Sequence, residues 1–314
     1  MMREDGPACV RRLNEKHGTR YFKTHSLLPS LSEPQQALLR SQTGRNCARA
    51  FTAVPCDKAV RVAPERFRVA LCRRLRLPLL LSEGRCEGCG ELLDAFGDHY
   101  AACMRTGRVQ ARAKPVERAW EKVLKEAGAT THWQKLLRET TLRLANPLRD
   151  SRRTDVLATC LPLWHGRALL CDATVVSPLT ARGEARPGTA RRDGVALKSA
   201  ERVKAQQEYP DVVSSDVIEF FVLATEVGGR WNDTATDLLD SLARHKAKTA
   251  PEALRRSVEL AWADRWWATL GVAVQDALAA SLLAPSGKKL VLDQKAAPEP
   301  ELDQLLDAQR WAEE

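Results

Sequence analysis

Apolar residues change their spacing after residue 128, from a helical to a strand-like pattern. Between Pro115 and Gly128 they recur every three or four positions, which predicts an amphipathic helix that opens at the proline and ends at the glycine. Beyond this helix, apolar and β-branched runs predict strands over residues 140–144, 154–159, 168–176 and 217–225. A helix over residues 195–208, which Pro210 prevents from continuing, separates the last two strands. This order predicts an α/β core with helices packed on a mixed sheet.

Helical patterns precede this core. Residues 32–41 predict a short helix that Ser30 or Ser32 can cap. Pro64 opens a second helix, which ends before Pro78 and in which apolar residues alternate with arginines. Two interpretations of this basic helix remain open: a contact with nucleic acid, or a solvated face packed on a core.

Helical patterns also follow the core. Asn232 or Asp233 is expected to cap a helix that reaches Lys248, and Pro251 starts another that runs to about residue 283. The last helix carries three tryptophans: Trp262, Trp266 and Trp267. Since tryptophan is more often part of a core than a stacking platform for a ligand, we interpret these three as structural.

Composition narrows the classes of protein that fit. The chain has 314 residues, of which 44% are hydrophobic, and a formal net charge of +9. This charge favours an acidic partner such as nucleic acid, although a basic protein without such a partner fits equally well. Nine cysteines are too few for a disulfide scaffold in a chain of this length, and no secretory signal is visible. The longest apolar run, residues 77–81, is too short to span a membrane, so we expect no membrane association and reduced cysteines.

Four of the potential metal ligands lie close together in the sequence. Cys86 and Cys89 form a CxxC pair. Nine residues separate Cys89 from His99, and three separate His99 from Cys103. Three thiolates and one imidazole make a complete tetrahedral set, as in structural zinc sites. The alternative is a group of buried thiols beside a histidine, but the spacing in a polar stretch favours zinc.

Carboxylates mark a second candidate site. Asp172 lies in the middle of an apolar strand, where an unpaired charge would be costly, and Asp155 lies at the start of the preceding strand. If the two strands are neighbours, both carboxylates reach one end of the sheet and supply the hard oxygen ligands that Mg²⁺ or Mn²⁺ prefers. Such an ion can activate water and neutralise charge on a phosphate.

Other charged residues can complete this site. Lys204 lies on the helix that follows the strand of Asp172, and we expect it to assist the attacking water, with Lys198 and Arg202 as alternatives. Glu117 and Glu121, on the preceding helix, can complete the metal shell. Each residue also has a simpler explanation as a solvated charge or a local ion-pair partner.

Arginine pairs predict where nucleic acid would bind, because the guanidinium fork suits phosphate oxygens. We expect the zinc knuckle, with Arg73 and Arg74 on the basic helix, to grip nucleic acid. Arg191 and Arg192 lie in a basic loop over residues 179–194, which we expect to lie along phosphate and to become ordered on binding.

These motifs together resemble the C-terminal region of non-long-terminal-repeat retrotransposon polyproteins, in which a CCHC knuckle precedes a restriction-enzyme-like nuclease of the PD-(D/E)XK type. The knuckle matches at the ligands named above, and the resemblance covers about residues 26–284. Arg153 and Asp155 match the first nuclease motif, Asp172 the second, and Lys204 with Tyr209 the third. The chain departs from the family at three points in these motifs. Thr154 replaces a proline, the gap from Asp155 to Asp172 is longer than usual, and Lys204 and Tyr209 are one residue further apart than expected.

The resemblance implies a restriction-endonuclease-like fold and a metal-dependent endonuclease that nicks target DNA. It also implies structural zinc, catalytic magnesium or manganese, DNA and element RNA as partners, a separate reverse transcriptase chain, and a nuclear location. No polymerase signature such as Tyr/Phe-Ala-Asp-Asp occurs in the sequence. Two other functions are open: an inactive, zinc-containing nucleic-acid-binding remnant, or a protein-interaction module that uses the tryptophan-bearing helices.

The chain is thus expected to comprise five segments, with a mobile lead-in and tail around three structured parts. These are a lead-in (1–30), a helical basic region (31–85), the zinc knuckle (86–110), the nuclease-like domain with its C-terminal helices (111–284), and a tail (285–314) with a short helix over residues 302–311.

Overall fold

A four-stranded mixed sheet forms the centre of the computed structural model, which describes residues 28–79, 84–142, 144 and 146–284. The strands lie in the order β1-β2-β3-β4. Their bounds are Thr130–Trp133 for β1, Val156–Thr159 for β2, Ala168–Val176 for β3 and Ile218–Glu226 for β4. The first two pairings are antiparallel and the last is parallel. The predicted α/β class and the strands at β2, β3 and β4 are confirmed.

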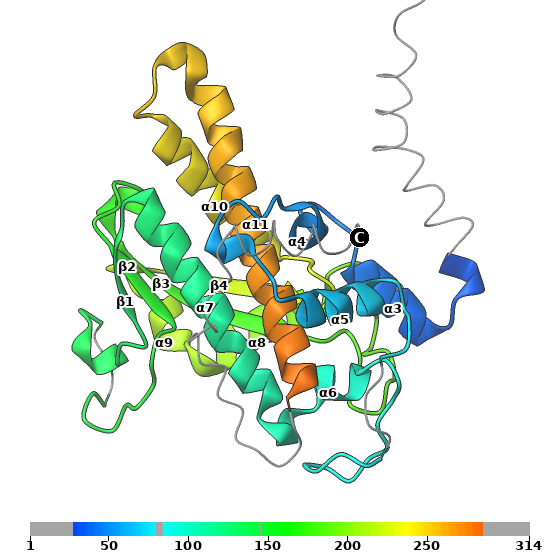
Figure 1. Ribbon diagram of the computed structural model, residues 1–314. Coiled ribbons are helices and arrows are strands. Elements are labelled where there is room, and N and C mark those ends of the chain that lie inside the picture. The colour runs from blue at the N-terminus through cyan, green and yellow to red at the C-terminus, as the bar shows by residue number, and fades with distance from the viewer. Residues whose placement is uncertain (1–27, 80–83, 143, 145, 285–314) are drawn as a thin grey trace, which may run out of the picture.

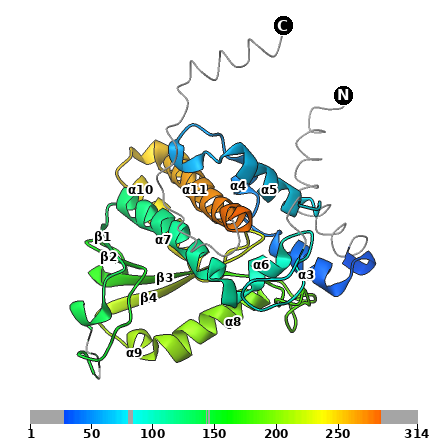
Figure 2. The same ribbon diagram turned by 60° about the horizontal axis from the view of Figure 1, so that its bottom comes forward.

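Helices cover both faces of this sheet (Figure 2). One face packs against α7 (Arg108–Ala127), α10 (Asp233–Ala247) and α11 (Arg255–Leu283). The other face packs against α8 (Val195–Val203) and α9 (Pro210–Val213). Side chains of a strand alternate between the two faces. In β3, Leu169, Cys171 and Ala173 therefore join the core under α7, while Leu170 points to the α9 side. By the same alternation, Asp172 points toward the face that α8 covers.

The first strand lies earlier in the chain than predicted. Residues 140–144 were expected to form it, but Thr130–Trp133 pairs with β2 instead, and none of the described residues of the expected segment is in a strand. Leu137–Glu139 forms a short 3-10 turn, and the Thr140 hydroxyl donates a 2.6 Å hydrogen bond back to the Leu137 carbonyl. Threonine favours this local turn as readily as a strand, so the β-branched pattern was misleading there.

Helix α7 begins seven residues before the expected start at Pro115. A proline inside a helix removes one hydrogen bond, and it usually marks the first turn. Here the preceding turns are held by buried arginines. Arg112 donates to the Ala101 carbonyl at 2.9 Å, and Arg108 donates to the carbonyls of Ser281 and Ala284. These long-range contacts fix the first turns of α7 and are invisible in the local pattern.

The helices outside the core mostly follow the predictions. Ser32 caps α3 (Glu33–Ser41), and α5 spans Pro64–Arg74. The Asn232 side chain accepts a hydrogen bond from the Ala235 amide and so caps α10. The shorter elements are α4 (Arg49–Thr52), α6 (Asp98–Ala102), 3-10 turns at Leu28–Ser30, Lys58–Val60, Met104–Thr106, Trp164–Gly166 and Glu252–Leu254, and a π-helix at Lys204–Glu208.

Helix α11 passes through the middle of the fold and contacts α7, α5 and α4 (Figure 1). Trp266 and Trp267 are buried in the main core and Trp262 packs against it, which confirms their structural interpretation. Residues 252–283 contain an 18-residue stretch long and apolar enough to cross a membrane, and 78% of that stretch is buried inside the protein. Its apolar side chains are thus used in packing.

The helical region, the knuckle and the sheet share one hydrophobic core. Val69 of α5, Cys86 and Cys103 of the knuckle, and Val116 of α7 belong to the same buried cluster as the strands. The expected lead-in lies almost entirely outside the described residues, as do the whole tail and its short helix.

Candidate functional sites: a Cys/His metal centre and a buried carboxylate cluster

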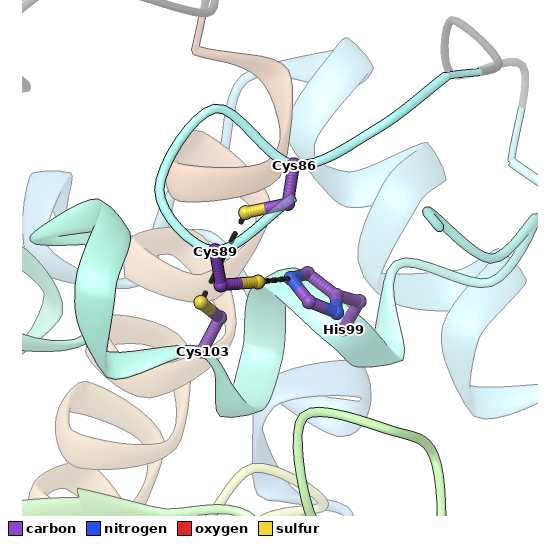
Figure 3. Close-up of side chains that lie close together, drawn as sticks. All are labelled: Cys86, Cys89, His99 and Cys103. Carbon is purple, nitrogen blue, oxygen red and sulfur yellow. Dashed lines mark hydrogen bonds between the residues drawn. The ribbon is translucent and has the colours of Figure 1, made fainter. Parts of the chain in front are cut away.

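Three thiols and one imidazole converge where the loop that precedes α6 packs against that helix. The ligand atoms of Cys86, Cys89, His99 and Cys103 all lie within 4.8 Å of one another. In Figure 3 the sulfurs and the imidazole point into a common space. Cys86 Sγ lies 3.9 Å from Cys103 Sγ, and Cys89 Sγ lies 3.3 Å from His99 Nε2. The predicted group can therefore hold a metal ion, and its chemistry is compatible with zinc.

The surrounding backbone shapes this centre. A Cβ on Gly88 would lie 2.9 Å from the Arg105 carbonyl, so only glycine allows the CxxC turn to approach so closely. Asp94 accepts backbone N–H groups from Phe96, Asp98 and His99. Burial alone would raise the pKa of Asp94, but these hydrogen bonds outweigh it and lower that pKa. The charged carboxylate thus fixes the start of α6, which carries the histidine.

The metal ligands face the interior. His99 and Cys103 are 2% exposed, and Cys86 is 3% exposed. Cys89 is only partly buried, and the expected contact of the knuckle with nucleic acid stays a prediction. His99 Nδ1 lies 2.7 Å from the carbonyl of Ala181, a residue of the basic loop. A hydrogen bond from Nδ1–H to that carbonyl leaves Nε2 as the metal ligand and joins the centre to the loop.

The second site is the carboxylate of Asp172, which is 2% exposed in the middle of β3. Lys204 Nζ donates to Asp172 Oδ2 at 3.1 Å and to Glu208 Oε2 at 2.7 Å. The other oxygen, Asp172 Oδ1, is buried without a hydrogen-bond partner. An unsatisfied buried carboxylate oxygen is costly, so it requires an explanation.

Asp155 and Glu117 lie beside Asp172. In the β2–β3 register Val156 is opposite Cys171, and extending that register by one residue puts Asp155 opposite Asp172. Asp155 Oδ2 accepts the Ala173 amide at 2.8 Å, and its Oδ1 accepts Gln134 Nε2 at 3.2 Å. The same nitrogen donates to Glu117 Oε2 at 2.8 Å. Gln134 thus links Glu117 of α7 to Asp155, which lies just before β2 and opposite Asp172.

Burial raises the pKa of each of these acids, and neighbouring carboxylates add to the shift. Burial is the largest cause for Asp155, and the charges of Asp172 and Glu117 add to it, so that its pKa rises to about 8. Burial also raises the pKa of Asp172, although Lys204 opposes the shift. For Lys204, burial would lower the pKa, but the pairing with Asp172 and Glu208 outweighs it, so its pKa is raised and it stays a cation.

A π-helix carries the lysine. The Tyr209 amide donates to the Lys204 carbonyl, five residues earlier, at 2.9 Å. A π-turn accommodates one residue more than an α-turn, which matches the extra residue noted between Lys204 and Tyr209. Tyr209 therefore still reaches the sheet, where its hydroxyl donates to the Arg153 carbonyl and its ring is buried. Thr154, which stands where the nuclease motif that the sequence resembles has a proline, is fully buried.

The alternative site residues lie elsewhere. Lys198 and Arg202 are exposed on α8, whereas Lys204 contacts Asp172. Glu121 pairs with Arg118 and Lys125 and is not part of the carboxylate cluster. Its expected place in the metal shell is therefore wrong.

Two of the four predicted nucleic-acid contacts are internal. Arg73 is buried, donates to the Phe96 carbonyl and pairs with Asp98. Arg74 donates to the backbone carbonyls of Cys47, Gln42 and Gly228. These arginines bind the protein's own chain, so their assignment to nucleic acid is corrected. The pair Arg73 and Arg74 resembled a phosphate-binding site because a sequence does not show which groups an arginine side chain contacts.

The loop over residues 179–194 does present arginines to solvent. Arg191 and Arg192 are exposed, and Arg182 extends outward beside Glu91 of the knuckle loop. The loop already has its own hydrogen bonds, for example from Arg186 Nε to the Ser177 and Leu179 carbonyls. These bonds give the loop a defined conformation, and its ordering on binding to nucleic acid stays a prediction.

Gln134 and Trp133 were missed by the sequence reasoning. Both donate to Glu117 Oε2, the tryptophan through Nε1 at 3.0 Å. A glutamine in a polar stretch gives no signal of such a role.

No family model matches the chain, and no curated protein sequence matches it.

Proposed function

We propose that the protein is a metal-dependent DNA endonuclease that nicks its target. Its core would be of the restriction-endonuclease type, and it would derive from a non-long-terminal-repeat retrotransposon polyprotein. The observation that carries the proposal is the convergence of Asp155, Asp172 and Lys204 at one place on the sheet, with a buried oxygen of Asp172 unsatisfied. Titratable residues from three separate segments that meet at a buried point of a sheet mark a candidate functional site.

A hard divalent cation would suit the oxygen ligands of this carboxylate set. Asp172 Oδ1 has no hydrogen-bond partner, and Asp155, Asp172 and Glu117 all have raised pKa values, mainly because of burial. A Mg²⁺ or Mn²⁺ ion held by these oxygens would satisfy that oxygen and offset the repulsion. When bound, such an ion lowers the pKa of its water and neutralises charge on the scissile phosphate.

The chain's own groups then have separate tasks. Lys204, which remains protonated, can hold the attacking water by a hydrogen bond and stabilise negative charge that develops on the phosphate. Asp172 keeps the ammonium group in place through the 3.1 Å contact. The hydrogen bond from the Tyr209 hydroxyl to the Arg153 carbonyl, together with the π-turn, would hold Lys204 in position over the sheet.

Nucleic acid would contact the exposed arginines of the loop over residues 179–194. We place this contact at Arg191 and Arg192, because Arg73 and Arg74 donate hydrogen bonds to carbonyls within the protein. The zinc centre would act by fixing the loop through the contact between His99 and Ala181. Element RNA, a reverse transcriptase chain and a nuclear location remain proposals that rest on the family resemblance.

The test is nicking of supercoiled plasmid with Mg²⁺, Mn²⁺ or EDTA. Wild type is expected to nick only with a metal ion, and Asp172→Ala should lose nicking while it keeps salt-sensitive DNA binding. Metal-dependent nicking that survives in Asp172→Ala would refute the assignment. DNA binding without nicking by wild type would instead favour the inactive nucleic-acid-binding remnant.

A further inference from the structure

Gln134 occupies a position between carboxylates that sequence did not reveal. It follows β1 directly, and its Nε2 donates to Glu117 Oε2 at 2.8 Å and to Asp155 Oδ1 at 3.2 Å. Two carboxylate oxygens as neighbours require the NH₂ side of the amide to face them. The amide therefore bridges two acids that would otherwise repel each other.

The backbone of Gln134 is held in an unfavourable conformation. Its φ is +53°, in the left-handed region that favours glycine. Its amide donates to the Asp155 carbonyl at 3.1 Å, and its carbonyl accepts from Arg153 Nη1 at 2.9 Å. These two backbone hydrogen bonds, together with the two from the side chain, fix the residue next to the first nuclease motif. This φ costs a glutamine more than it would cost a glycine, so the surrounding contacts hold Gln134 in place against that cost.

We propose that Gln134 is a positioning residue of the divalent-cation centre: its carboxamide holds Glu117 and Asp155 at the spacing from which both can face the ion next to Asp172. This inference rests on the proposed function, because it assumes that the carboxylates bind Mg²⁺ or Mn²⁺. Hydrogen-bonding partners that orient metal ligands typically contribute 10-fold to 100-fold to metal affinity. A role in the fold alone would leave metal affinity unchanged.

Two substitutions separate these roles. Gln134→Met keeps the size of the side chain and removes both donors. Gln134→Gly removes the side chain and relieves the positive φ, but it also leaves Glu117 and Asp155 without their shared donor, so its metal-free fold should be no more stable than that of wild type. If Gln134 positions the carboxylates, both variants should bind Mn²⁺ about 10-fold or more weakly. Gln110→Met, at an exposed position of α7, is the matched control and should bind like wild type.

The experiment is calorimetric titration of zinc-loaded protein with Mn²⁺ at pH 8, without nucleic acid, beside thermal melts of each metal-free variant. The expected result is weaker Mn²⁺ binding by both Gln134 variants, each of which still melts in one cooperative transition when metal-free. Wild-type affinity in both variants overturns the inference and leaves the nuclease proposal intact, provided that Asp172→Ala has lost Mn²⁺ binding. Absence of Mn²⁺ binding by wild type overturns both.

Discussion

Replacing Asp155 by asparagine should make the metal-free protein more stable at alkaline pH. Burial and the neighbouring carboxylates raise the pKa of Asp155 from 3.8 to about 8. Between these two values the folded state holds the proton more tightly than the unfolded chain does. The stabilising contribution of Asp155 to the free energy of unfolding is therefore fully present below pH 3.8 and is lost as pH rises through 8. Asparagine cannot ionise and should remove this loss.

The size of the effect follows from the two pKa values. From pH 6 to pH 8.5, linkage for a single carboxyl with these values amounts to roughly 2–3 kcal/mol of lost unfolding free energy. For a chain of 314 residues that corresponds to a fall in Tm of about 3–6 °C. A divalent cation requires the ionised carboxylate, so at pH 8.5 its binding should reverse the loss, by about 2.7 kcal/mol at 100 times its Kd.

The assay is a set of thermal melts of zinc-loaded protein at pH values from 6 to 8.5, with and without Mg²⁺. Wild type without Mg²⁺ should lose stability as pH rises, and Asp155→Asn should lose distinctly less and gain nothing from Mg²⁺. Asp216→Asn, at an exposed aspartate, is the control and should follow wild type. Equal pH slopes for wild type and Asp155→Asn, or Mg²⁺ stabilisation that survives in Asp155→Asn, would refute the reasoning.

Three further predictions test the metal centre, the loop and the packing. Cys103→Ser should lose bound zinc, measured as the metal-to-protein ratio, and melt at a lower temperature, because metal binding contributes to folding; full zinc occupancy would contradict it. The double variant Arg191→Ser, Arg192→Ser should bind DNA more weakly, with the slope of log affinity against log salt reduced by up to about 0.9 per lost phosphate contact; an unchanged slope would exclude the loop. Gly228→Ala would put a Cβ 2.3 Å from Ser41 Oγ, so it should lower unfolding free energy by about 1–3 kcal/mol in denaturant titrations, and an unchanged midpoint would argue against that packing.

Local chemistry accounts for what could be predicted from the sequence. The four metal ligands lie within eighteen positions of chain, so their spacing alone indicates a closed site. The strand over residues 168–176 has the predicted bounds, because its apolar, β-branched run is bounded by turn signals. Asp172 stood out in that run because a buried carboxylate is costly. These inferences need only neighbours in sequence or elementary solvation.

The errors and omissions have a common physical cause, since each depends on a contact between distant segments. Arg73 resembles a phosphate ligand until the fold buries it against Asp98. The first turns of α7 exist because Arg108 reaches the end of α11. Gln134 gains its position only when β1 brings it between Glu117 and Asp155. A sequence pattern reports the propensity of a segment but not its partners.

The sequence by itself thus determined the α/β class, the Cys/His ligand set and the importance of Asp172. Only the tertiary structure decided which groups face that carboxylate. Lys204 reaches Asp172 because a π-turn carries it over the sheet, and the same turn absorbs the extra residue before Tyr209. Charge at a buried site depends on distances across the fold, and those distances arise only when strands and helices pack together.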